Sequence, residues 1–403
     1  MNPRRSFITL FNLLYIFVSI AWPPFQLYYL RADGAGRTLL TLSILVVIMN
    51  VIELQRYKKA FATPAFRCWM ALLCYSMLNS LVKGFYSEYG ALIFFNVNYV
   101  FPIVFLAIAM LELAKDKQQA MKVIWLALII YFILGLPFMG RNLNERFEVE
   151  GLGNLYPLHL VALLYVSAIL LIERNIKTWH FIVLAFFITI AILISGTRKA
   201  FGAEIIILLG VILNNRKRKD VWFYIKMILL GFVLLVFVRF SLSHSTVGQR
   251  IEEGAEEDNM VQLVENQRAN AVLVKLLGDR AIQYELGLEL FHQHFLTGIG
   301  LDNFIPVARS DYRLHTEYMV QLCENGLIGF ILLVLYYVHI GKALKTAKKR
   351  TIPKVINMVS YGLFVILFLN FTAWTYNQNF AMIIYAILLT YSNPKLNYVI
   401  KAS

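Results

Sequence analysis

Long apolar runs separated by short polar segments recur along the 403 residues of this chain. A helix needs about 20 apolar residues to cross the roughly 30 Å hydrocarbon core of a bilayer. About twelve runs approach that length, and they lie near residues 6–30, 38–54, 66–82, 92–113, 120–140, 155–173, 179–196, 200–215, 221–243, 317–341, 356–376 and 379–394. The sequence therefore predicts an all-α fold, a polytopic membrane bundle of about 12 transmembrane helices.

The composition excludes the common soluble classes. Hydrophobic residues make up 59% of the chain and charged residues 15%, whereas a soluble domain is about 25% charged. A disordered chain has few apolar residues and many charges, which is the opposite pattern. The composition therefore indicates an integral membrane protein.

The net charge of +14 is interpreted as a topology signal. With the N-terminus placed inside, the inner segments hold 23 Lys and Arg residues and the short outer loops hold 7. Cytoplasmic loops carry this kind of excess, so both termini are predicted to be cytoplasmic. Arg4 and Arg5 precede an apolar run without a small-residue cleavage site, which favours a retained helix. Nucleic acid is not an expected partner, whereas membrane lipids are.

One polar segment, residues 244–316, is predicted to form a long extracytoplasmic loop between helices in 1–243 and 317–403. It contains 11 of the 24 acidic residues. Within it, residues 271–297 show apolar residues at helical spacing and predict an amphipathic helix. Loops of this length are usually functional or disordered. The acidic stretch 252–258 is interpreted as a solvated face or hinge rather than a metal site.

Two motifs follow that amphipathic helix. The first is Gly298-Ile-Gly300-Leu-Asp302, whose glycines predict a tight turn. The second, Asp311-Tyr-Arg313-Leu-His315-Thr-Glu317-Tyr, leads into a helix that carries Glu324-Asn-Gly326. His315 would lie near the outer membrane surface, either as an interfacial residue that anchors the helix or as a residue that takes part in chemistry.

Two further outer loops bring arginines toward the same face. Arg198 follows the short connection Ser195-Gly-Thr, and it either anchors the helix at the interface or binds an anion, because a guanidinium suits phosphate bidentately. Glu204 lies about 9 Å deeper along the same helix at 1.5 Å per residue, and a carboxylate there is expensive unless it faces a cavity or a partner. Arg146 lies in a loop with Gly151 and Gly153.

Several motifs are absent from the sequence. It has no Gly-x-x-x-x-Gly-Lys-Ser/Thr motif for ATP, no Cys and His set with zinc spacing and no Asp-x-Asp pair. ATP-driven transport and a sugar transferase with acidic metal ligands are therefore disfavoured, and neither a metal nor another cofactor is expected.

These residues together resemble the O-antigen ligase and O-antigen polymerase superfamily. The resemblance rests on the Arg280-led run, the Gly-Ile-Gly turn and His315-Thr-Glu-Tyr before Gly-Leu-Ile-Gly, together with the Thr-Arg198 outer turn. It covers roughly residues 140–340. Thr316 stands where the family often has Asn.

The resemblance implies a metal-independent glycosyltransferase with a fold like that of the GT-C class, in the bacterial cytoplasmic (inner) membrane. The donor would be a glycan on undecaprenyl diphosphate, and the acceptor would be lipid A-core or another carrier-linked glycan, reached on the outer face. The diphosphate-binding arginines would be Arg198 and Arg280, and the essential histidine would be His315. Supporting roles are expected for Arg146, Glu204, Arg313 and Glu317.

The sequence leaves three functions open. A ligase uses lipid A-core as the acceptor, whereas a polymerase uses another carrier-linked glycan, and both chemistries fit the same residues. A transporter of polysaccharide or lipid-linked glycan is a third function. It would predict internal repeats and broken helices at mid-membrane, and no clear repeat is present.

Overall fold

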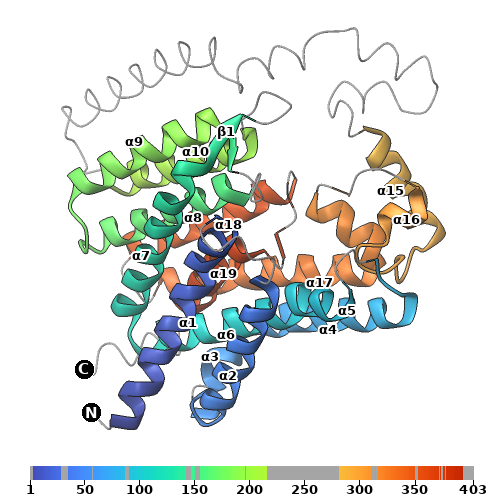
Figure 1. Cartoon of the computed structure of the whole chain (residues 1–403), viewed down its shortest axis with the longest axis horizontal. Helices are drawn as coiled ribbons and strands as arrows, with labels where there is room; N and C mark the ends of the chain where they lie inside the picture. Colours follow the sequence, from blue (N-terminus) through green and yellow to red (C-terminus); the bar gives the residue numbers. More distant parts are fainter. Residues whose placement is uncertain are drawn as a thin grey trace, which may run out of the picture.

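The computed structural model describes residues 3–28, 35–56, 58–86, 90–141, 147–149, 155–195, 197–215, 281–309, 314, 316–349, 353–371, 373, 375–376 and 378–393. This part of the chain is a helical bundle with one small hairpin (Figure 1). The predicted span near 221–243 and most of the predicted outer loop lie outside the described residues.

The N-terminal half supplies nine of the helical elements. They are α1 (Pro3–Tyr28), α2 (Ala35–Arg56), α3 (Lys58–Phe61), α4 (Pro64–Lys83), α5 (Ala91–Phe95), α6 (Phe101–Lys115), α7 (Lys117–Gly135), the π-helical turn η1 (Asn96–Val100) and the 3-10 turn η2 (Leu136–Phe138). Local capping sets some of these bounds. Thr63 accepts from the backbone N–H of Phe66 before Pro64 begins α4, and the Asp116 side chain caps α7.

The second half continues as α8 (Leu155–Ile172), α9 (Thr178–Ile194), α10 (Arg198–Asn215), α15 (Ala281–Gln293), α16 (Phe304–Ala308), α17 (Glu317–Lys348), α18 (Pro353–Asn370) and α19 (Asn379–Ser392). Two three-residue strands, β1 (Met139–Arg141) and β2 (Phe147–Val149), pair antiparallel between η2 and α8. This hairpin is a small addition to the predicted all-α fold.

Among the described residues, helices occupy eleven of the predicted runs. Six helices are long and apolar enough to cross a membrane, namely Pro64–Lys83, Ala91–Lys115, Lys117–Phe138, Leu155–Ile172, Glu317–Lys348 and Pro353–Asn370. Four shorter apolar helices accompany them within the described residues. The multi-pass membrane character is therefore supported, whereas the count of about twelve stays a prediction.

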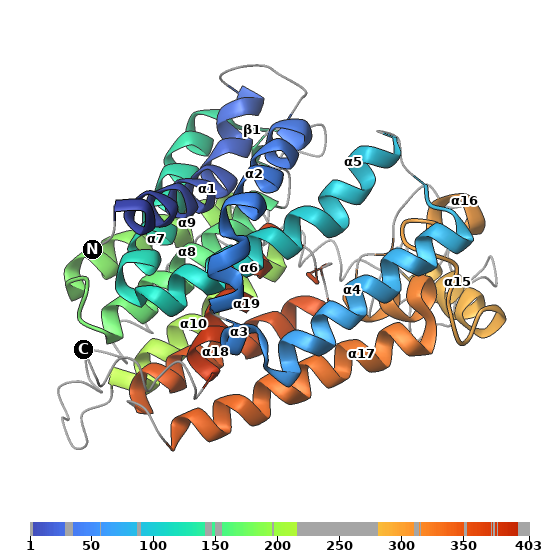
Figure 2. The same ribbon diagram turned by 90° about the horizontal axis from the view of Figure 1, so that it is seen from below.

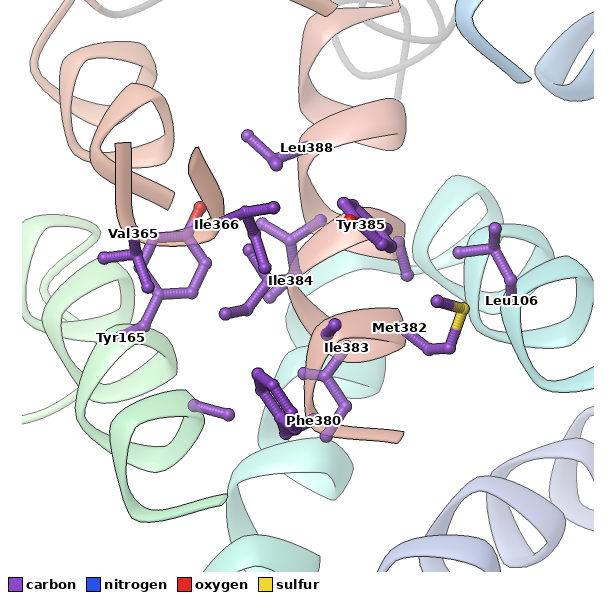
Figure 3. Close-up of a cluster of buried hydrophobic side chains, with 14 of the residues drawn as sticks. Leu106, Tyr165, Val365, Ile366, Phe380, Met382, Ile383, Ile384, Tyr385 and Leu388 are labelled. Atoms are coloured by element: carbon purple, nitrogen blue, oxygen red, sulfur yellow. The ribbon is translucent and has the colours of Figure 1, made fainter. Parts of the chain in front are cut away.

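The core forms around α8 and α19, which run through the middle of the bundle (Figures 1 and 2). Every residue of α19 from Phe380 to Ser392 is buried, as are nearly all residues of α8. Figure 3 shows Phe380, Ile384 and Tyr385 of α19 packed between Tyr165 of α8 and Leu106 of α6. A helix that is apolar on all sides belongs in such a core.

A buried polar network joins α1, α2 and α6 away from this core. The Asn12 side chain donates to Asn50 Oδ1 at 2.8 Å and to Glu112 Oε1 at 2.6 Å, and Asn50 donates back to Asn12 at 2.6 Å. Lys115 Nζ lies 2.9 Å from Glu112 Oε1 and 3.7 Å from Glu53 Oε2. Buried polar groups need such partners, so this network fixes how the first two helices pack.

A second polar contact lies at the end of α8. The Tyr391 hydroxyl donates to Glu173 Oε1 at 2.9 Å, and Lys117 Nζ lies 4.0 Å from the Tyr391 ring centroid. Burial raises the pKa of the Glu173 carboxyl, and the hydrogen bond from Tyr391 and the charge of Lys117 partly offset this rise. These contacts tie the start of α7 to the ends of α8 and α19, at the end predicted to be cytoplasmic.

The Asn12 network predicts a stability effect. Asn12→Leu removes the donor to Glu112 and both bonds with Asn50, and should destabilise the protein by about 1–3 kcal/mol, measured as a lower melting temperature in detergent. Leu10→Ala, at an exposed position of the same helix, is the control and should change little. Equal melting temperatures for the two variants would contradict the structural role of the network.

Candidate functional site

The Gly298–Gly300 turn docks on α17 through backbone hydrogen bonds. Ile299 N donates to Cys323 O at 3.0 Å and Gly300 N to Glu324 O at 2.9 Å. In the other direction, Leu327 N donates to Phe295 O at 2.9 Å and Ile328 N to Leu296 O at 3.3 Å. The two segments therefore pair like short strands, although one of them belongs to a helix.

This pairing requires a break in α17. Gly326 has φ 64° and ψ −167°, a conformation outside the helical region, and divides α17 into Glu317–Asn325 and Leu327–Lys348. A break in a helix frees backbone N–H and C=O groups that need new partners. The 295–300 segment supplies those partners, so the turn and the break depend on each other.

Glycine is required on both sides of the contact. A Cβ on Gly298 would lie 2.4 Å from the Glu324 carbonyl carbon, and a Cβ on Gly326 would lie 2.4 Å from Leu296 O. Both glycines also have positive φ, 67° and 64°, which side chains disfavour. Gly298, which the sequence predicted as a turn residue, thus forms one backbone-to-backbone contact with Gly326, which it did not.

Polar residues of α4 hold the docked turn from the other side. Asn79 Nδ2 donates to Thr297 O at 2.7 Å and to Glu324 O at 3.0 Å, so one amide bridges the turn and α17. Ser80 Oγ accepts from Leu301 N at 3.3 Å. Figure 2 shows α4 and α17 side by side, with α15 and α16 at one end of the pair.

Glu324 fixes the residue that follows the turn. Its Oε2 accepts from the backbone N–H of Asp302 at 3.0 Å. Asp302 has φ 60°, which a non-glycine residue adopts rarely. The Asn303 side chain then donates to Ile299 O and Gly84 O, each at 2.9 Å. The chain from Gly298 to Asn303 is therefore bonded at nearly every step.

Glu317, the first residue of α17, makes a second buried anchor. Its Oε2 accepts from the backbone N–H groups of Thr375, at 2.7 Å, and Tyr376, at 3.0 Å. Its Oε1 accepts from Gln321 Nε2 at 2.8 Å. Trp69 of α4 donates its indole N–H to Tyr376 O at 3.1 Å. The carboxylate thus joins the start of α17 to the connection between α18 and α19.

A chain of polar side chains continues inward from this anchor. Thr375 Oγ1 donates to Asn370 Oδ1 at 2.5 Å, Asn370 donates to the Tyr337 hydroxyl at 2.9 Å, and the Tyr337 and Tyr385 hydroxyls lie 2.8 Å apart. All of these residues are buried. Satisfied networks of this kind rigidify the packing around them, so the N-terminal end of α17 is held on a fixed support.

Helix α10 carries the other described site residues. Arg198 is exposed at its first turn, whereas Glu204 is 1% exposed. Glu204 Oε1 accepts from the Thr189 hydroxyl of α9, and its Oε2 has no hydrogen-bond partner in the described part of the chain. Glu204 is therefore bonded to Thr189 rather than to an arginine. A supporting role of Glu204 toward Arg198 stays a proposal.

The remaining predicted site residues, His315, Arg280, Arg146 and Arg313, lie outside the described residues. The structure does describe chain neighbours of two of them. Thr316, next to His315, accepts from Met319 N and caps α17, and Ala281, next to Arg280, begins α15. Whether the arginines and the histidine converge stays a prediction.

Sequence reasoning missed Asn79, Ser80, Trp69 and the 373–376 connection. A polar Asn-Ser pair inside an apolar run was the available signal for the first two. Nothing in the sequence links Trp69 to a backbone carbonyl 307 residues away. Among the described residues, no group of three His, Cys, Asp or Glu side chains could hold a metal ion.

Residues 181–334 match the family model described as O-antigen ligase. This region belongs to the O-antigen ligase superfamily. The resemblance seen in the sequence is therefore confirmed over α9, α10, α15, α16 and the N-terminal part of α17, whereas α4 and the 371–378 connection lie outside the match. No curated protein matches the chain.

The glycine contact predicts a position-specific cost. Gly298→Ala combines a positive φ with a collision against Glu324, so it should destabilise the protein by more than the roughly 1–2 kcal/mol of the backbone strain alone. Gly90→Ala is the matched control, since its φ is 84° with nothing within 4 Å of the added Cβ. Melting temperatures in detergent give the comparison, and similar losses in both variants would show that the docked contact is not tight.

The Glu317 anchor predicts a second loss. Glu317→Ala leaves three buried N–H groups without their acceptor and should destabilise the protein by about 3 kcal/mol. Hydrogen exchange should also speed up at the amides of Thr375 and Tyr376. Glu285→Ala, at an exposed position of α15, serves as the control. Unchanged protection of both amides in Glu317→Ala would refute the anchor.

Proposed function

We propose that the protein is an O-antigen ligase-type glycosyltransferase of the bacterial cytoplasmic membrane. It would transfer a glycan from undecaprenyl diphosphate to a sugar hydroxyl of lipid A-core. The observation that carries this proposal is the O-antigen ligase match over 181–334, together with the rigid outer framework that its Gly298 and Gly326 segments form in the structure.

The donor diphosphate would be bound by two arginines. Arg198 begins α10 and is exposed there, and Arg280 directly precedes α15 in the chain. When the bond from the anomeric carbon to the phosphate oxygen breaks, the diphosphate keeps the electron pair and gains charge. Guanidinium groups aimed at that charge stabilise the transition state more than the ground state, which supports a metal-independent reaction.

His315 would act as the general base. The acceptor hydroxyl attacks the anomeric carbon, its proton passes to the imidazole, and undecaprenyl diphosphate leaves with the electrons of the broken bond. A direct attack of this kind inverts the anomeric centre. Histidine suits the step because its pKa lies near neutrality. Thr316 and Glu317, the next two residues, are both buried and hydrogen-bonded.

The other predicted residues would have supporting roles. Glu317 would position His315 through its bonds to Thr375 and Tyr376. Arg146 and Arg313 would add positive charge near the donor, and Glu204 would shape the packing beneath Arg198 through Thr189. The site would lie on the outer face of the membrane, with both termini cytoplasmic.

A polymerase is the alternative with the same chemistry. It would use a second carrier-linked glycan as the acceptor instead of lipid A-core, and the O-antigen ligase match does not separate the two. Purified protein supplied with each acceptor distinguishes them. Movement of the donor across a liposome membrane without any transfer product would instead identify a transporter.

The proposed chemistry is tested with His315→Ala. We expect transfer to fall by roughly 10²–10⁴-fold, the usual contribution of a general base, with donor binding and melting temperature nearly unchanged. Arg198→Lys keeps the charge but not the bidentate fork, and should weaken donor binding. His292→Ala, at an exposed position of α15, is the matched control. Full transfer activity in His315→Ala would refute the base assignment.

A further inference from the structure

Helix α15 presents three different surfaces around its axis. Its inward side consists of Gln283, Gly287 and Leu290, all buried. This side packs closely on the start of α17, since a Cβ on Gly287 would lie 3.0 Å from Met319 Cε and 3.2 Å from Leu314 Cδ2. This packing fixes the rotation of α15 about its own axis. It therefore determines which residues lie on each of the two outer flanks.

The two outer flanks differ in chemistry. At 3.6 residues per turn, Tyr284, Leu288 and Phe291 fall on one flank, and the Phe291 and Phe295 ring centroids lie 5.1 Å apart. The opposite flank consists of residues that are all polar and exposed, namely Glu285, Glu289, His292 and Gln293. Helix α15 therefore has three sides, of which one is buried against the protein, one is apolar and one is polar. Each side is expected to contact a different environment.

The apolar flank is continuous with the exposed apolar surface of a candidate membrane span. Leu296, which is 59% exposed, accepts a backbone hydrogen bond from Ile328 of α17. Ile328 begins a stripe of exposed residues at helical spacing along the longest of the candidate membrane spans, and it is followed by Ile331, Leu335 and Val338. The exposed apolar surface of α17 therefore continues through Leu296 and Phe295 onto α15.

The neighbouring span extends the same surface. The outer end of α4 exposes Leu78, Leu81 and Val82, the last of them 81% exposed. This end contacts the docked turn directly, because Tyr75 and Asn79 of α4 both donate to Thr297 O. Leu296 and Phe295 thus lie beside two helices whose exposed surfaces must face hydrocarbon if these helices span the bilayer.

We propose that α15 lies on the outer surface of the membrane, with the flank of Leu288, Phe291 and the following Phe295 among the lipid acyl chains. The flank of Glu285, Glu289 and His292 faces water. Helices with a large apolar flank and a polar opposite flank bind membrane interfaces in this way. Lipid is the occupant because the apolar flank joins the exposed apolar stripes of α17 and α4 through Phe295 and Leu296. Neither of these two connecting residues is charged.

Site-directed spin labelling in proteoliposomes tests the proposal. The background is Cys68→Ala with Cys74→Ala, and Cys323 stays because it is fully buried. Single labels are attached through Leu288→Cys and Phe295→Cys on the apolar flank. The matched controls on the polar flank of the same helix are Glu285→Cys and Glu289→Cys. Relaxation is measured with oxygen, which concentrates in lipid, and with a water-soluble nickel chelate.

We expect oxygen to dominate at positions 288 and 295 and the nickel chelate to dominate at positions 285 and 289. Nickel accessibility at position 288 equal to that at position 289 would place both flanks in water and overturn the proposal. Shielding of position 288 from both reagents would show that protein covers this flank, which also overturns it. If Phe295→Cys lowers the melting temperature, Leu288→Cys decides, because its side chain is already 37% exposed.

Discussion

In an apolar environment every backbone N–H and C=O needs a partner within the protein, and the packing of α17 depends on how this constraint is met at Gly326. The helix leaves its regular geometry there, and the 295–300 segment supplies four backbone hydrogen bonds across the break. Without that segment the break would leave unpaired groups. Without the break, the turn would have no site on which to dock.

The contacts around this break join segments inside the family match to segments outside it. The turn and the N-terminal piece of α17 lie within residues 181–334. Asn79 of α4, which bonds to both, lies outside it, as does Trp69, which bonds to Tyr376. The same holds for the backbone donors of Thr375 and Tyr376. The family segment is thus held by helices from both ends of the chain, which a sequence match over one region does not reveal.

Much of the fold could be predicted because apolar runs of membrane length have few alternatives to helix. The turn at Gly298 was also predictable, since closely spaced glycines favour tight turns. The role of Gly326 was not predictable, because the sequence shows it as one glycine within a helical run, whereas the structure gives it a φ of 64° at the contact with the turn. Contacts such as Trp69 with Tyr376 depend on the global packing of the helices. The placement of His315 and Arg280 stays a prediction.

The position of the break along α17 has a consequence for the bilayer itself. Between Gly326 and the first lysine of the basic end, Lys342, the helix spans Leu327–Gly341, or ~22 Å at 1.5 Å per residue. This is shorter than the roughly 30 Å thickness of a hydrocarbon core. A span that is short for its membrane is accommodated by snorkelling of flanking residues, such as Lys342, or by thinning of the surrounding bilayer. Thinning beside α4 and α17 would bring lipid head groups toward the docked turn.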